Sequence, residues 1–378
     1  MKFDLTLGWL ALVAGLTGCA GRSSPAFPVP PLPSEHLAVR VYLIGDAGAP
    51  APGGEPVLAA LSRELKGSSG ERVVVFLGDN VYPRGMPAAG RRTRPEAERR
   101  LAAQIEVITS SGATGYFVLG NHDWKGEGDG RAAVTRQEQF IDSAGAGRVN
   151  LEPAAGCPGP SAVDVGRRLR LVLLDTNWWL QPKTSRHTFA CATSTEPEIT
   201  DSLRQAVRGA GDRIVVVAAH HPLTSGGVHG GYFGWKDHIF PLRIPVPGLW
   251  LPLPLLGSLY PAARQHGISS QDIPSPAYQR LISAMRRAFT GAEPALYAAG
   301  HEHNLQVIAG GPAGLEVVSG VGVYGHSGRA VRVKGSLFAH KASGFARLDV
   351  PWNGRPRLAV LEVNASGVSR EVFSTKVE

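Results

Sequence analysis

Five short apolar segments of this sequence each end in a cluster of aspartate, asparagine or histidine. Their length and composition are typical of buried strands in an α/β fold. The segments are Leu37–Ile44, Val73–Leu77, Tyr116–Leu119, Ile214–Ala219 and Ala295–Ala299. In α/β sheets, ligand sites lie just beyond the carboxyl ends of strands. We therefore expect one cleft, lined by the polar residues that follow these segments: Asp46, Asp79, Tyr82, Asn121, His122, His220, His301 and His303.

The rest of the chain continues this alternation of strands and helices. Residues 94–109 carry Leu101, Ile105 and Ile108 at helical spacing, and Leu281–Ala288 has a similar pattern. Another helix is expected where Val57, Leu58, Leu61 and Leu65 share one face. Further strands are expected at Leu169–Leu174 and in residues 315–320, 344–349 and 357–364. The pattern predicts an α/β fold.

Length and composition limit the classes of protein that remain. The 378 residues are enough for one large domain or two average ones. An apolar share of 43% and a charged share of 19% exclude a mostly disordered chain. The net charge of +8 is weak evidence for anionic partners. The basic run Arg91–Arg94 lacks the interleaved aromatic residues of a nucleic-acid site, so we expect a solvated helix start and no nucleic-acid partner.

The first residues indicate export. Lys2 precedes an apolar run from Leu5 to Leu16 that is too short to span a bilayer and is typical of a signal peptide. Leu16-Thr17-Gly18-Cys19 resembles a bacterial lipobox, in which cleavage leaves a lipid on the cysteine. We therefore predict a signal over residues 1–18, and a lipidated Cys19 followed by a proline-rich tether to residue 36. By resemblance to known lipoproteins, Ala20 favours the outer membrane; the alternative is a plain signal peptide.

The remaining cysteines, Cys157 and Cys191, form an even pair in an oxidising compartment. A disulfide between them is the favoured prediction, with two buried thiols as the alternative. The folded domain is expected to span residues 37–378.

The residue types in the predicted cleft are those of a metal site. Carboxylate oxygens suit Mn or Fe, and imidazole nitrogens suit Zn, Fe or Ni. The phenolate of Tyr82 would suit Fe(III), and Asp79 sits centrally enough to bridge two ions. Seven ligands are too many for one tetrahedral zinc. Two neighbouring ions could clamp the attacking and leaving oxygens of a displacement at phosphorus.

The sequence resembles the calcineurin-type metallophosphoesterases over about residues 38–375. Five motifs appear in the family's order: Gly45-Asp46-Ala47-Gly48, Gly78-Asp79-Asn80-Val81-Tyr82, Gly120-Asn121-His122-Asp123, Val217-Ala218-Ala219-His220 and Gly300-His301-Glu302-His303-Asn304-Leu305-Gln306. Within the superfamily it resembles the small, tartrate-resistant type of purple acid phosphatase. The marks of that type are Tyr82, three residues after Asp79, and His229, nine residues after His220.

The resemblance implies an α/β/β/α sandwich of two mixed sheets and a role for each motif residue. Asp46, Asp79, Tyr82 and His303 would hold Fe(III). Asp79, Asn121, His220 and His301 would hold a divalent ion, either Fe, Zn or Mn. His122 and His229 would contact the phosphoryl group or protonate the leaving group. His221 directly follows a ligand, and a structural role is expected for it.

A departure from the small purple phosphatases lies between the last two ligand motifs. Residues 231–275 form an insertion that is apolar between Ile239 and Tyr260 but carries five prolines there, which exclude a regular transmembrane helix. Three interpretations remain open: a lid or rim over the cleft, a surface that touches the bilayer, and a loop packed on the domain's own surface.

Together these features predict an exported, lipid-anchored binuclear phosphatase acting on phosphomonoesters. One alternative is a phosphodiesterase with the same metal site, and another is a non-catalytic surface binding module. The sequence leaves open the substrate, the divalent metal and the oligomeric state.

Overall fold

The computed structural model describes residues 29–126, 130–182, 191–243, 248–254 and 256–378. The predicted signal peptide, Cys19 and the first part of the tether lie outside these ranges.

Two seven-stranded mixed sheets form the body of the protein. In the first sheet the strand order is β14 (Ser369–Lys376), β13 (Arg357–Val363), β12 (Gly344–Pro351), β1 (Leu37–Ile44), β2 (Glu71–Phe76), β3 (Thr114–Phe117) and β4 (Val149–Leu151). In the second sheet it is β11 (Ser336–His340), β9 (Leu305–Ala309), β10 (Leu315–Ser319), β8 (Leu296–Ala299), β7 (Ile214–Ala218), β6 (Leu169–Leu173) and β5 (Ser161–Val165).

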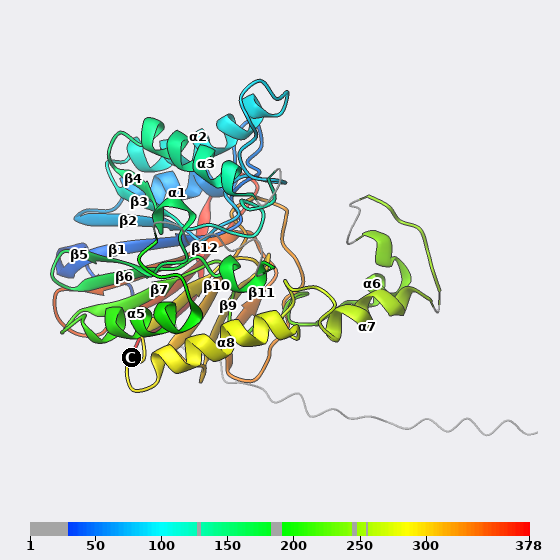
Figure 1. Cartoon of the computed structure of the whole chain (residues 1–378). Helices are drawn as coiled ribbons and strands as arrows, with labels where there is room; N and C mark the ends of the chain where they lie inside the picture. Colours follow the sequence, from blue (N-terminus) through cyan, green and yellow to red (C-terminus); the bar gives the residue numbers. More distant parts are fainter. Residues whose placement is uncertain (1–28, 127–129, 183–190, 244–247, 255) are drawn as a thin grey trace, which may run out of the picture.

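Helices cover the outer face of each sheet (Figure 1). The first sheet is covered by α1 (Pro56–Lys66), α2 (Arg94–Thr109) and α3 (Arg131–Ala144). The second is covered by α4 (Asn177–Leu180), α5 (Glu196–Arg208) and α8 (Pro276–Phe289). The inner faces of the two sheets share a core of aliphatic side chains, such as Val41, Val75 and Val216. The predicted α/β/β/α sandwich is therefore confirmed, and α2 has the predicted bounds.

The ends of the helices are set by local sequence. Thr195 and Glu198 form a reciprocal capping box at the start of α5, and the hydroxyl of Ser275 accepts a hydrogen bond from N of Tyr278 at the start of α8. Each of these helices also has proline in its first turn, where a missing N–H costs nothing.

A disulfide joins Cys157 and Cys191, as the cysteine count predicted. It ties the chain just before β5 to the segment that leads into α5, and both elements belong to the second layer of the sandwich.

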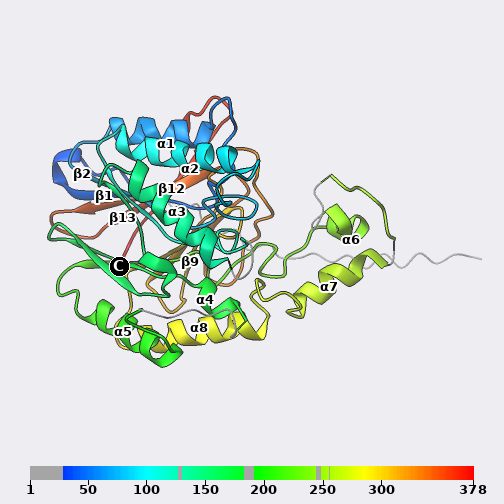
Figure 2. The same cartoon turned by 45° about the horizontal axis from the view of Figure 1, so that its top comes forward.

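The insertion forms an arm that projects from the body (Figures 1 and 2). It contains α6 (Trp235–Ile239) and α7 (Leu259–Gln265). Eight of the twelve exposed large apolar side chains in the described part of the chain lie in residues 231–275, among them Trp235, Trp250 and Leu259. Of the three open interpretations, a loop packed on the domain's own surface does not describe α6 and α7, which project from the body. Among the described residues, no helix is both long and apolar enough to cross a bilayer.

Candidate metal centre

Five strands bring the predicted ligands to one edge of the sandwich. Strands β1, β2 and β3 are parallel neighbours in the first sheet, and β7 and β8 are parallel neighbours in the second. The loops after them meet so closely that only glycine fits at the joints. A Cβ on Gly78 would lie 2.6 Å from Nδ1 of His220, and one on Gly120 would lie 2.3 Å from Oδ1 of Asp79. The glycines that precede Asp79 and Asn121 therefore have a steric cause.

Three of the predicted ligands have strained backbones. Asp46, Asp79 and His301 have φ values of 57°, 56° and 67°, in the left-handed region that residues other than glycine rarely adopt. Each turn is held by a hydrogen bond from another loop: N of His301 donates to Asp46 (2.8 Å), and N of His122 donates to Asp79 (2.7 Å). Strain of this kind concentrates at functional sites, where the surrounding structure enforces it.

Asp46, Tyr82 and His303 form one half of the centre. The hydroxyl of Tyr82 donates to Oδ1 of Asp46 at 2.8 Å, and Nε2 of His303 lies 3.2 Å from the same oxygen. Burial, together with the charges of Asp46 and Asp79, raises the pKa of Tyr82 well above its usual value. Burial alone would lower the pKa of His303, but its hydrogen bond to Asp46 and the charge of that residue raise it to about 9.

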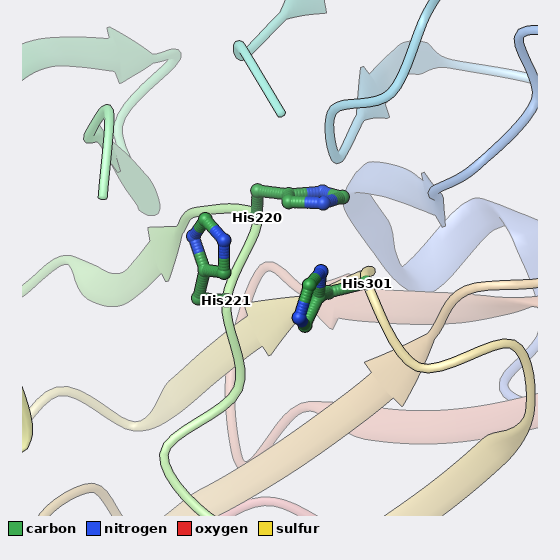
Figure 3. Close-up of side chains that lie close together, drawn as sticks. All are labelled: His220, His221 and His301. Atoms are coloured by element: carbon green, nitrogen blue, oxygen red, sulfur yellow. The ribbon is translucent and has the colours of Figure 1, made fainter. Parts of the chain in front are cut away.

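His220, His301 and Asn121 form the other half. Nδ1 of His220 lies 2.8 Å from the carbonyl oxygen of Leu77, and Nε2 of His301 lies 3.0 Å from that of Gln271. A carbonyl oxygen only accepts, so these two nitrogens carry the protons. In a neutral imidazole the other ring nitrogen carries a lone pair, and in both histidines that nitrogen lies 3.1 Å from Oδ1 of Asn121. Figure 3 shows how closely the rings of His220 and His301 approach each other.

These contacts fit bound cations. Two imidazole lone pairs and an amide oxygen face one another, and Nε2 of His220 lies 3.5 Å from a carboxylate oxygen of Asp79. Ligand atoms of Asp46, Asp79 and His220 also lie within 4.8 Å of one another. Positive ions would satisfy these lone pairs, and the hydrogen bonds on the outer ring nitrogens would orient the histidines as ligands. All seven predicted ligands thus gather in one place, with Asp79 between the two halves.

His221 lies beside this cluster but has a partner on each ring nitrogen. Its Nδ1 lies 2.8 Å from the hydroxyl of Thr176, and its Nε2 lies 3.0 Å from Oε1 of Gln271. Burial lowers its pKa well below the usual value, so the ring is neutral. Both contacts agree with the structural role expected for His221.

His122 stands at the edge of the centre, next to a lysine that no motif of the sequence marks. Its Nδ1 donates to the carbonyl oxygen of Pro83 (2.8 Å), and its Nε2 accepts from Nζ of Lys125 (2.8 Å). Nε2 also lies 4.0 Å from Asp79. Burial lowers the pKa of His122, although the charge of Asp79 opposes this shift. The positive charge on this side of the centre is therefore carried by Lys125.

His229 packs against a ligand and is held by the arm. Its ring centroid lies 4.0 Å from that of His301, and its Nδ1 lies 2.9 Å from Oδ1 of Asp272. Arg264 on α7 binds both carboxylate oxygens of Asp272, with Nε at 2.8 Å from Oδ2. The base of the arm thus orients one of the two predicted catalytic histidines.

Four residues near the centre are not predicted by the sequence motifs: Lys125, Arg264, Gln271 and Asp272. The last three lie in the insertion, where no motif marks them and the apolar composition draws attention elsewhere. Lys125 lies three residues after His122, which is a weak local signal.

Asp123 connects two of the motifs. Its carboxylate accepts hydrogen bonds from N of Gly120 (2.8 Å), N of Asn80 (3.0 Å) and N of Val81 (3.1 Å). Burial and the charge of Asp79 raise its pKa to about 8. Asp123 therefore ties the loop after β2 to the loop after β3, and so sets the spacing between Asp79 and Asn121.

Comparisons with known proteins agree with this geometry. Residues 39–246, more than half of the chain, match the family model described as calcineurin-like phosphoesterase. No curated protein matches the sequence.

Solved structures are similar in fold at low sequence identity. One is GAP50, described as the anchor in the inner membrane complex of Plasmodium, with 16% identity and a TM-score of 0.57 over 90% of this chain and 88% of that one. Another is the purple acid phosphatase PPD1 from yellow lupin seeds, with 13% identity and a TM-score of 0.51 over 92% of this chain and 55% of that one.

Proposed function

The chain belongs to the calcineurin-like phosphoesterase family and is a metal-dependent phosphoester hydrolase, and from this premise we propose that it hydrolyses phosphomonoesters at a binuclear centre. The observation that carries the proposal is the pair of imidazole lone pairs, on His220 and His301, that face Oδ1 of Asn121 at 3.1 Å. With Asp79 beside them, and Asp46, Tyr82 and His303 beyond it, the donor set is sufficient for two ions.

The residues around the centre have separate tasks in this proposal. Bound ions would supply a hydroxide nucleophile and positive charge for the phosphoryl oxygens. Lys125 and His122 hold the phosphoryl group from the solvent side, where the ammonium offsets charge that develops in the transition state. His229, on the side of His301, is placed to deliver a proton to the leaving oxygen. The close contacts between the ligand loops at Gly78 and Gly120 keep the ligands in position.

We assign the purple type of centre, with Fe(III) at Asp46, Asp79, Tyr82 and His303 and a divalent Fe, Zn or Mn at the other half. The proposal is supported by the position of the Tyr82 hydroxyl, 2.8 Å from Asp46 and 3.1 Å from His303. The test is metal content with a visible spectrum. About two metals per chain, including iron, and a band that disappears in Tyr82→Phe are expected. A coloured protein that keeps its band in Tyr82→Phe would overturn the phenolate assignment.

A phosphodiesterase is the second candidate. A cavity of about 300 Å³ lies against Asn121 and is lined in part by Gln271 from the base of the arm. This cavity has room for the second ester group of a diester. Rates with 4-nitrophenyl phosphate and bis(4-nitrophenyl) phosphate separate the two candidates: the monoester should react faster, and a faster diester would reverse the assignment.

We also propose that the protein acts after export, anchored to the outer membrane by a lipid on Cys19. The lipobox-like Leu16–Cys19 and the Cys157–Cys191 disulfide support export, since disulfides are rare in reducing compartments. Fractionation of cells that express wild type and Cys19→Ala tests the anchor. The lipid-modified form should be absent from the variant. A mature wild-type chain whose mass includes no lipid would contradict lipidation.

A further inference from the structure

A cavity of about 310 Å³ lies beside the metal centre, between the loop that follows β2 and the start of α3. Four of the side chains that line it are cationic: Arg84, Arg91, Lys125 and Arg136. No carboxylate belongs to its lining among the described residues. A cavity lined in this way attracts anions, because concave walls concentrate the field of the charges.

Lys125 connects this cationic cavity to the reaction site. Its Nζ lies 2.8 Å from Nε2 of His122, and the same residue lines the cavity against Asn121. A substrate with its phosphoryl group at the metal centre therefore has two cavities within reach. Among the described residues, Lys125 is the charged residue that lines the first, whereas the second is lined by four cations.

The charges of the two sites also act on each other. Burial lowers the pKa of Lys125, the charge of Asp79 raises it, and the charge of Arg84 lowers it again. Lys125 thus lies within electrostatic reach of both the bridging carboxylate and the cationic cavity.

Two of these cations, Arg84 and Arg136, differ from the other arginines nearby. In α2, Arg94 pairs with Glu98, and Arg99 and Arg100 pair with Glu96. Arg136 instead donates from Nε to the carbonyl oxygen of Met86 (2.9 Å), and neither Arg136 nor Arg84 forms an ion pair with a carboxylate in the described part of the chain. Both guanidinium groups can therefore bind an external anion, and guanidinium forms its strongest hydrogen bonds with phosphate and carboxylate.

We propose that this cavity binds a second anionic group, a phosphate or a carboxylate, on the alcohol side of the substrate. The inference rests on the proposed phosphatase function and narrows its substrate class to phosphomonoesters of small alcohols that carry another anion. Arg84 and Arg136 would contact that second group, while Lys125 would stand between it and the phosphoryl group.

The test uses three series of probes on the metal-loaded chain starting at Arg22, which contains every described strand and helix. The probes are ω-hydroxyalkyl phosphates, the matching α,ω-alkanediol bisphosphates and the matching ω-carboxyalkyl phosphates, each with two to six carbons. We expect kcat/KM for the best bisphosphate or carboxylate probe to exceed that of the matching hydroxyl probe at least tenfold, or about 1.4 kcal/mol at 25 °C. The bisphosphate and carboxylate arms identify which anion is preferred.

Variants locate the effect. Arg84→Gln and Arg136→Gln should each lower the ratio of anionic to hydroxyl probe about fivefold, and the double variant should abolish the preference. Arg148→Gln is the matched control, since Arg148 is exposed and donates to the carbonyl oxygen of Gly112, away from both cavities; its ratio should equal that of wild type.

Calorimetric binding of the same probes separates failure of this inference from failure of the proposed function. In one outcome the bisphosphate binds more tightly than the hydroxyl probe, Arg84→Gln weakens that binding, and no probe is hydrolysed. This outcome would support the anion site and overturn the phosphatase proposal. Hydrolysis of all probes with equal kcat/KM and equal affinity would overturn the anion site and keep the phosphatase. In that case the cations are already neutralised within the protein.

Discussion

The hydroxyl of Tyr82 donates a 2.8 Å hydrogen bond to Oδ1 of Asp46. In the absence of metal, the phenol is therefore protonated, and its raised pKa keeps it so. The proposed ferric ligand must lose this proton when the ion binds, and His303, whose pKa is about 9, must lose one as well. Metal uptake at this half of the centre is thus coupled to proton release.

Metal affinity should rise with pH. Below pH 9 the metal-free protein holds a proton on both Tyr82 and His303. The apparent affinity should therefore increase about tenfold per pH unit for each proton released. Competition titrations with a chelator between pH 6 and 8 measure the slope. Tyr82→Phe should lower the slope by one proton, and an affinity independent of pH would contradict the protonation of Tyr82 and His303 in the metal-free protein.

Removal of His122 should slow the reaction without emptying the centre. Nε2 of His122 lies 4.0 Å from Asp79 but is bound to Lys125, so the ring is not a ligand. We expect His122→Ala to lower kcat by about 10² or more, the usual scale for a group that moves a proton or stabilises charge. Metal analysis of the variant should still find two ions. An unchanged rate would remove His122 from the mechanism.

Asp272 should act only through His229. It lies 2.9 Å from Nδ1 of His229 and is held by Arg264. We expect Asp272→Asn to lower kcat about tenfold and to leave KM nearly unchanged, because it disturbs the orientation of the ring. In a double-mutant cycle, Asp272→Asn should have no further effect once His229→Ala is present. Additive losses would show that Asp272 has a separate role in folding or binding.

The free energy of unfolding should fall as the pH rises, because of the buried Glu316. Its Oε1 accepts from N of Leu223 and N of Thr224, while its Oε2 is buried without a hydrogen-bond partner in the described part of the chain. Burial raises its pKa to about 7 from 4.5. The folded state therefore holds an extra proton between these values, and stability falls as the pH rises through this range.

Glu316→Gln should remove this dependence. At pH 8 the variant should exceed wild type by at most about 3 kcal/mol, and the gap should close below pH 5. Urea unfolding of the metal-free proteins at both pH values measures the difference, in which the contributions of the metal ligands cancel. An equal gap at pH 5 and pH 8 would mean that Glu316 is ionised in the folded protein.

Loss of the disulfide should destabilise the domain. Cys157 and Cys191 are 34 residues apart, and a loop of that length is worth roughly 3–4 kcal/mol in the chain-entropy account. We expect the double variant Cys157→Ser, Cys191→Ser to lose stability on this scale in urea unfolding. Reduced wild type is the control and should match the variant. Equal stability of all three forms would show that the cross-link is not needed.

The positions of the metal ligands could be predicted because their signal is local. A strand is recognised from a few consecutive apolar residues, and Gly-Asp or Gly-His at its end identifies the turn. The seven ligands, the two β layers inferred from the family and the bounds of α2 were accessible in this way. Even the glycines have a local signal, although the close contacts that require them, such as Gly78 against His220, appear only in the fold.

Other features depended on contacts between distant parts of the chain. Gln271 reaches His301 across 30 residues, and Asp272 reaches His229 across 43. Nothing near either residue in the sequence indicates these partners, because the arm in which both residues lie has no motif. The same holds for the cationic cavity, where residues of two loops and α3 come together.

The sequence alone therefore determined which side chains end the strands, since strand formation and turn chemistry depend on neighbouring residues. The tertiary structure decided how those side chains are protonated and oriented, and which charges surround them. These properties arise from carbonyl oxygens, carboxylates and cations brought close by folding: the carbonyl of Leu77 for His220, Asp46 for Tyr82 and Lys125 for His122.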